Sequence, residues 1–129
     1  MVELSELRKE FSVLEGDERI FAVLLFGSHV RRRTHKKSDL DICVVAPNSD
    51  PKEIMQSIFR KVNLSKKNYD VYIFEELPLY LKMEVITKHR VVFARDKYKL
   101  YEYFYLYRKL WADQQHRNEL KKEELKAML

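Results

Sequence analysis

The stretch VLLFGSHVRRRTHKKSDLDICVV, residues 23–45, decides the fold of this chain. The apolar run IFAVLLF at residues 20–26 stops at a Gly-Ser pair, and a basic loop follows it. A second apolar run, LDICVVA at residues 40–46, is entered through Asp-Leu-Asp. Short continuous apolar runs are typical of strands buried on both faces. A strand that only packs a core has no need of two acids at its entrance, so we interpret them as part of a site.

The rest of the chain predicts helices around these strands. Asp50, Pro51 and Glu53 form a helix-start signal of N-cap, first-turn proline and capping-box partner. Hydrophobic spacing predicts helices at residues 3–14, 51–62, 77–89 and about 97–129, the last as one helix or two in series, and further strands at residues 68–74 and 90–95. The core-facing side of the helix at 51–62 is predicted to carry Ile54, Met55, Ile58, Phe59 and Val62. The fold class is therefore α/β (α+β), with a small mixed sheet flanked by helices and a long C-terminal helix.

Composition limits the class of protein further. The chain has 129 residues, of which 46% are hydrophobic, so residues 1–129 are expected to form a single domain. No apolar run approaches the roughly 20 residues of a membrane span, and the charged start does not resemble a signal peptide. A single cysteine, Cys43, excludes an internal disulfide, so we expect a cytoplasmic protein. The net charge of +5 is compatible with an anionic partner such as a nucleotide or RNA.

Three acids are expected to meet at one end of the sheet. Asp39 and Asp41 are two residues apart at a strand entrance, so their side chains share a face. The strand–helix–strand unit from 40 to 74 makes its two strands parallel, which places Asp70 beside them. Carboxylates that converge in this way are suited to hard cations such as Mg²⁺.

The Gly-Ser pair faces these acids in the expected sheet. The loop between the first two strands is short, so strand 40–46 is expected to return antiparallel to strand 20–26. A helical turn that begins at Ser28 would hold a phosphate on its backbone N–H groups, and Gly27 would allow a close approach. A phosphate cradle opposite a metal site indicates phosphoryl or nucleotidyl transfer.

These residues resemble the DNA polymerase β-like nucleotidyltransferases. The resemblance rests on Gly27-Ser28, on Asp39-Leu40-Asp41 and on Asp70, and it covers about residues 18–95 as the core, with about 97–129 as a helical extension. It implies two Mg²⁺ ions held by Asp39, Asp41 and Asp70 as metal-binding and catalytic residues. It also implies ATP bound through Gly27, Ser28 and Arg31.

One departure from the family pattern lies in the loop. Members often continue the Gly-Ser with a small residue, an arginine and a glycine, whereas this chain reads GSHVRRR. Arg31 matches the arginine, Arg32 replaces the glycine and Val30 is larger than the usual alanine. The departure bears on nucleotide preference more than on the chemistry.

The small size resembles the minimal nucleotidyltransferase (MNT) antitoxins, which are paired with HEPN-domain toxins. That resemblance implies transfer of AMP from ATP to a tyrosine of a partner toxin. One alternative is an antitoxin or scaffold that acts by contact alone, and another is an RNA or small-molecule nucleotidyltransferase. A homo-oligomer formed through the C-terminal helix is a further expectation.

Two other features of the sequence, a basic loop and a tyrosine-rich stretch, each allow more than one interpretation. The basic loop at 29–37 is interpreted equally well as a triphosphate clamp, an RNA contact or a solvated loop that balances the nearby carboxylates, and nucleic acid is the less favoured partner. Five tyrosines in the stretch YKLYEYFYLYRKLW are at a spacing that favours a core face and a partner surface over base stacking.

Overall fold

A computed structural model describes residues 4–27, 40–64 and 68–129. Its four-stranded sheet has the order β3-β2-β1-β4 and is formed by β1 (Ala22–Phe26), β2 (Leu40–Val45), β3 (Tyr69–Ile73) and β4 (His89–Ala94). The helices are α1 (Leu4–Phe11), α2 (Pro51–Lys61), α3 (Leu79–Thr87) and α4 (Lys97–Met128), with 3₁₀ turns at Ser12–Gly16 and Phe74–Glu76. The predicted mixed α/β fold with a long C-terminal helix is confirmed.

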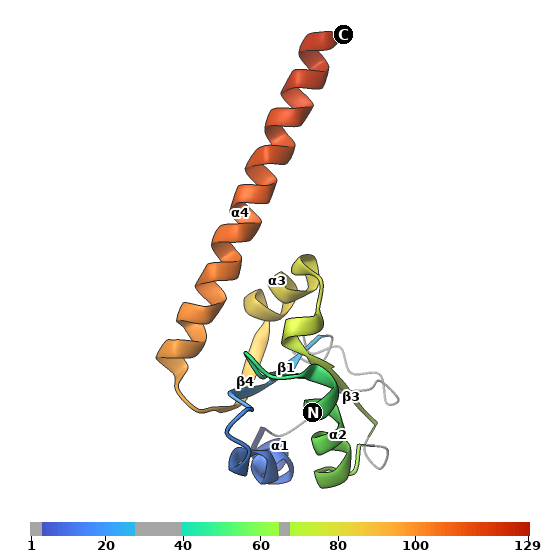
Figure 1. The fold of residues 1–129 in the computed structure, drawn as a ribbon, viewed down its shortest axis with the longest axis vertical. Helices are drawn as coiled ribbons and strands as arrows, with labels where there is room; N and C mark the ends of the chain where they lie inside the picture. Colours follow the sequence, from blue (N-terminus) through green and yellow to red (C-terminus); the bar gives the residue numbers. More distant parts are fainter. Residues whose placement is uncertain (1–3, 28–39, 65–67) are drawn as a thin grey trace.

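The sheet separates two hydrophobic cores (Figure 1). Alternate residues of β1 serve each core, since Val23 and Leu25 pack with α1 and α2, whereas Leu24 packs with α3 and α4. Every residue of β1 is buried, as its continuous apolar sequence predicts for a central strand. The edge strand β3 is exposed at alternate positions instead.

The directions of the first three strands follow the prediction. β1 and β2 are antiparallel, β2 and β3 are parallel, and β4 lies antiparallel to β1 at the opposite edge of the sheet. The Asp50 carboxylate accepts a hydrogen bond of 3.0 Å from the backbone N–H of Lys52 and caps α2 as predicted.

Two predictions about the helices are corrected. The helix expected at 3–14 ends at Phe11 and continues as a 3₁₀ turn, which still buries Leu14. Phe59, expected on the buried side of its helix, is 63% exposed. The sheet covers only a narrow stripe of α2, in which Ile54 and Ile58 are fully buried, and Phe59 lies beyond its border.

α4 extends far beyond the rest of the chain (Figure 1). Its first turns bury Leu100 and Phe104 against the sheet and α3. From residue 112 to residue 129 every side chain is exposed. No helix among the described residues is long and apolar enough to cross a membrane.

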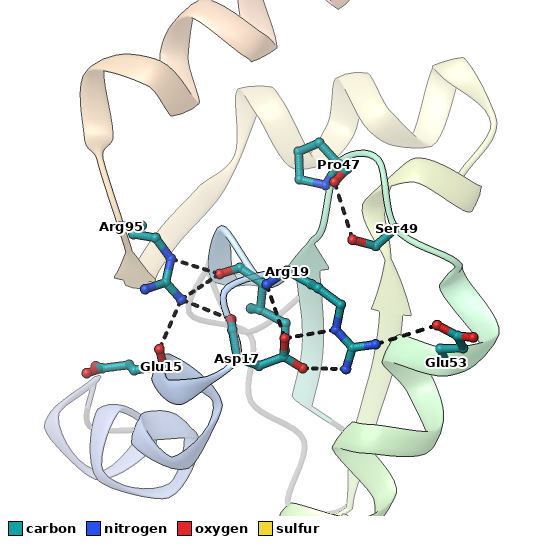
Figure 2. A network of polar contacts seen from close by, with 8 residues as sticks. Glu15, Asp17, Arg19, Pro47, Ser49, Glu53 and Arg95 are labelled. Atoms are coloured by element: carbon teal, nitrogen blue, oxygen red, sulfur yellow. Dashed lines mark hydrogen bonds and ion pairs between the residues drawn. The ribbon is translucent and has the colours of Figure 1, made fainter.

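A polar network fixes the segment that leads into β1 (Figure 2). The Asp17 carboxylate accepts hydrogen bonds of 2.9 and 2.6 Å from the Arg19 guanidinium, which also lies 3.6 Å from Glu53. Arg95, after β4, donates to the backbone carbonyls of Glu15, Asp17 and Ile20. The network ties the segment between α1 and β1 to the end of β4 and to α2.

This network gives a prediction for acid stability. The hydrogen bonds from Arg19 hold the pKa of Asp17 at about 2, against 3.8 in the unfolded chain. The stabilisation is therefore complete above about pH 4 and is lost as the pH falls through 2. Because the guanidinium is partly solvated, Asp17→Asn is expected to cost about 1 kcal/mol of unfolding free energy at pH 7.

Urea unfolding between pH 7 and pH 2 checks this, with Asp113→Asn, at an exposed position of α4, as the matched control. The gap between wild type and Asp17→Asn should close toward pH 2, whereas Asp113→Asn should follow wild type throughout. A gap that persists at pH 2 would contradict the assignment.

Candidate functional site

Asp41 and Asp70 lie side by side on neighbouring parallel strands. The strand register pairs Asp41 of β2 directly with Asp70 of β3, and the Leu40 N–H donates to the Asn68 carbonyl at 3.0 Å. Adjacent strands in a sheet are about 4.8 Å apart. The predicted meeting of these two acids at the start of their strands is confirmed.

Gly27 directly follows β1 and lies against the Asp41 carboxylate. Phe26 is paired in register with Asp41, so Gly27 follows at the mouth of the sheet. Its φ is +86°, and a Cβ at this position would lie 2.2 Å from Oδ2 of Asp41. Only glycine combines this backbone conformation with room for the carboxylate. The site therefore forms at the C-terminal end of β1 and at the N-terminal ends of β2 and β3.

Several predicted site residues lie outside the described part of the chain. These are Ser28, Arg31 and Asp39, together with the basic loop at 29–37. Within residues 4–27, 40–64 and 68–129, no group of three or more His, Cys, Asp or Glu side chains gathers as a metal site. The described part of the site thus contributes two carboxylates and one glycine.

Aromatic side chains adjoin the two acids. Tyr72 is two residues after Asp70 on β3 and therefore on the same face, and its ring meets that of Phe26 edge-on at 5.6 Å. Tyr72 is 39% exposed, whereas Phe26 is buried. Tyr72 was not predicted as a site residue, although the two-residue period that relates Asp39 to Asp41 also relates Tyr72 to Asp70.

The start of β3 is anchored from the opposite face. The Tyr69 hydroxyl donates a hydrogen bond to the Glu10 carboxylate of α1, and its ring lies 5.3 Å from that of Phe11. Burial, and then the neighbouring carboxylate, raise the pKa of Tyr69 above its ordinary value. A neutral, hydrogen-bonded tyrosine beside Asp70 holds the strand in register.

Cys43 lies behind Asp41 on the same face of β2 and is fully buried. Burial raises the pKa of its thiol well above the ordinary range, which keeps it protonated. Such a thiol is not a nucleophile, so the interpretation of Cys43 as a packing residue agrees with the structure.

A further carboxylate, that of Glu75, joins the sheet to α4. It accepts one hydrogen bond from the Ala46 N–H at 2.9 Å and another from the Tyr103 hydroxyl at 2.8 Å. The ammonium of Lys82 lies 5.7 Å from the Phe74 ring centre and 5.4 Å from that of Tyr107. These contacts fix the base of α4 on the face of the sheet that carries the acids.

Residues 9–98 match the family described as polymerase beta, nucleotidyltransferase. This chain belongs to that family, and its fold is that of a nucleotidyltransferase. The predicted resemblance to the polymerase β-like nucleotidyltransferases is thereby confirmed.

One relative is a protein of Methanocaldococcus jannaschii that bears the name "Putative protein adenylyltransferase MJ1547". It is 42% identical over 100 residues, which are 77% of this chain and 75% of the relative. This sequence identity, over about three quarters of each chain, places the two proteins in one family.

Solved structures share the fold over almost the whole chain. An MNT antitoxin in complex with a tri-AMPylated Shewanella oneidensis HEPN toxin matches with a TM-score of 0.67 and 13% identity, over 95% of this chain and 98% of the solved one. A toxin–antitoxin structure with AMP-PNP matches with a TM-score of 0.66 and 17% identity, over 96% and 98% of the two chains. At these identities the likeness shows the fold.

Proposed function

We propose that this nucleotidyltransferase moves AMP from ATP to a hydroxyl group of a partner protein, namely a tyrosine of a HEPN toxin. The observation that carries the proposal is the direct pairing of Asp41 with Asp70, closed on one side by Gly27. The relative with the adenylyltransferase name supports the reaction class. The MNT–HEPN complexes with the same fold support the partner.

The two described acids fit a divalent cation. Both donors are carboxylate oxygens, which Mg²⁺ prefers, and the missing side chain of Gly27 lets Oδ2 of Asp41 lie against the end of β1. Asp39, outside the described residues, is the proposed third ligand of a two-ion site. Bound Mg²⁺ would supply charge neutralisation at the phosphates during transfer.

The chain's own residues would divide the remaining work. In the proposal Gly27, Ser28 and Arg31 position the triphosphate at the end of β1. The acceptor oxygen forms a bond to the α-phosphorus, the bond from that phosphorus to the bridging oxygen breaks, and pyrophosphate leaves. Asp70 is on the outermost described strand of this side. In the proposal the acceptor enters beside it, and its carboxylate would receive the hydroxyl proton.

The test uses α-labelled ATP and Mg²⁺ in an extract of the cells that make this protein, with the Asp70→Ala variant alongside. The proposal expects a labelled band that resists ribonuclease, disappears with protease and is absent with the variant. A tyrosine linkage to AMP in that band identifies the acceptor. Label in RNA would favour the RNA alternative, and a band of equal strength with the variant would overturn the assignment of Asp70.

The shape of α4 favours one further candidate, inhibition of a partner by contact. Its exposed apolar side chains include Tyr98 at 85%, Leu106 at 62% and Tyr105 at 57%. A helix that extends for 18 residues without a supporting face is only marginally stable in water, so a partner surface would stabilise it. We propose the toxin for this surface rather than a second copy or nucleic acid.

Titration of toxin activity separates the two modes. Contact inhibition should be complete without ATP and in the Asp70→Ala variant, whereas inhibition by AMP transfer should require both ATP and Asp70. Since the proposed transfer uses ATP, we also propose that the protein is cytoplasmic.

A further inference from the structure

The order of groups across the sheet assigns a side to each substrate. Gly27 lies at the end of β1, Asp41 on β2 and Asp70 on β3, which is the last strand on that side among the described residues. In the proposed function the triphosphate lies toward Gly27. The acceptor therefore approaches from the β3 side, past the outer edge of the sheet.

A groove opens at this edge, between α2 and β3. It has a volume of about 510 Å³ and is lined by Met55 and Phe59 of α2, by Leu64 and by Asp70 itself, among others. Its wall is thus apolar on the α2 side, and Asp70 of the site is one of the residues that border it at the edge of the sheet. A pocket of this kind is suited to an apolar side chain whose neighbour is brought to the carboxylate.

Phe59 is the exposed part of this wall. It is 63% exposed, although Ile54 and Ile58 of the same helix are fully buried. It also borders a second hollow of about 420 Å³ at the C-terminal end of α2. Aromatic side chains, phenylalanine included, are enriched in protein interfaces relative to the rest of the surface. Its contribution to the core is small, so packing alone does not account for a phenylalanine here.

We propose that this groove binds an extended segment of the protein that is adenylylated, with one apolar side chain of that segment seated against Phe59. The inference rests on the proposed function and names how its protein substrate is held. β3 turns Tyr69 and Val71 toward α1 and α2 and Asp70 toward the opposite face. A segment that runs beside β3 alternates in the same way. The anchoring residue therefore stands directly before or after the acceptor residue in the partner.

The variant Phe59→Ser tests the proposal with two acceptors. One is the purified protein that the wild-type chain labels, and the other is N-acetyltyrosinamide, which is too small to reach the groove from Asp70. We expect kcat/KM for the protein acceptor to fall about tenfold or more, mainly through KM, as for loss of an interface anchor. Transfer to N-acetyltyrosinamide is expected to stay at the wild-type rate.

Two further variants sharpen the comparison. Tyr80→Ser removes an aromatic of similar exposure, 62%, from α3, and is expected to leave both acceptors unaffected. Phe59→Leu keeps an apolar wall and is expected to restore most of the affinity for the protein acceptor. Folding of each variant is checked by its urea unfolding midpoint.

Each remaining outcome counts against the inference. An unchanged KM for the protein acceptor in Phe59→Ser would overturn it while the proposed function stands. An equal loss with both acceptors would show that Phe59 supports the site structurally rather than the partner. Absence of label on any protein with the wild-type chain would remove the proposed function, and this inference with it, before any variant is compared.

Discussion

AMP transfer is expected to fall about 10³-fold when Asp41 or Asp70 is replaced by asparagine, while the fold stays intact. Asparagine keeps the shape of the side chain but removes the negative charge that a divalent cation requires. The two carboxylates are cross-strand neighbours, and like charges in that position repel. Because this repulsion opposes the other contacts of each carboxylate, removal of one charge is expected to change the unfolding free energy by less than about 1 kcal/mol.

A large loss of activity with little change in stability distinguishes a site acid from a structural one. Single-turnover transfer to N-acetyltyrosinamide and urea unfolding are measured on the same preparations. Asp113→Asn, on the exposed part of α4, controls for the loss of one negative charge and should change neither quantity. If Asp70→Asn transferred AMP at the wild-type rate, Asp70 would have no part in the reaction.

The meeting of these two acids could be predicted because it follows from local rules. A strand–helix–strand unit makes its strands parallel, and a two-residue period fixes which side chains share a face. The short loop after Gly27 made the first pair of strands antiparallel for a similar reason. Each step depends on residues within about 30 positions of one another, as expected for a single supersecondary unit.

Features that depend on distant pairing were not accessible in this way. The strand now seen as β4 was predicted, but nothing in its sequence says that it pairs with β1 rather than with β3. Phe59 was misplaced because hydrophobicity at helical spacing does not show how wide a stripe the sheet covers. For the same reason the groove beside Asp70 could not be predicted, because it depends on the Phe59 ring being left uncovered at the side of α2.

The structure gives Gly27 a role beyond the one predicted for it. Its place at the end of a buried strand suggested close approach of a phosphate, which stays a prediction together with the roles of Ser28, Arg31 and Asp39. The structure adds a neighbour from within the chain, since the space that a side chain would occupy at Gly27 already holds Oδ2 of Asp41. The glycine is required by the acid whether or not a nucleotide is bound.

The second large effect is therefore expected for Gly27→Ala, about a 10²-fold loss of AMP transfer. The new Cβ would lie 2.2 Å from Oδ2 of Asp41, so the carboxylate must leave its position beside Asp70. Displacement of a reacting group by about 1 Å is enough for a loss of this size. The φ of +86° adds strain for alanine, which is expected to cost about 1 kcal/mol of unfolding free energy.

Gly16→Ala is the matched control, because no atom lies within 4 Å of the Cβ that it would add. Transfer to N-acetyltyrosinamide and urea unfolding of both variants are compared at a temperature where each is fully folded. Gly16→Ala should match wild type in activity, whereas Gly27→Ala should lose activity even in its folded form. Full activity in folded Gly27→Ala would mean that the Asp41 carboxylate can leave its position beside Asp70 without loss of function. The active site would then require a different arrangement of the acids.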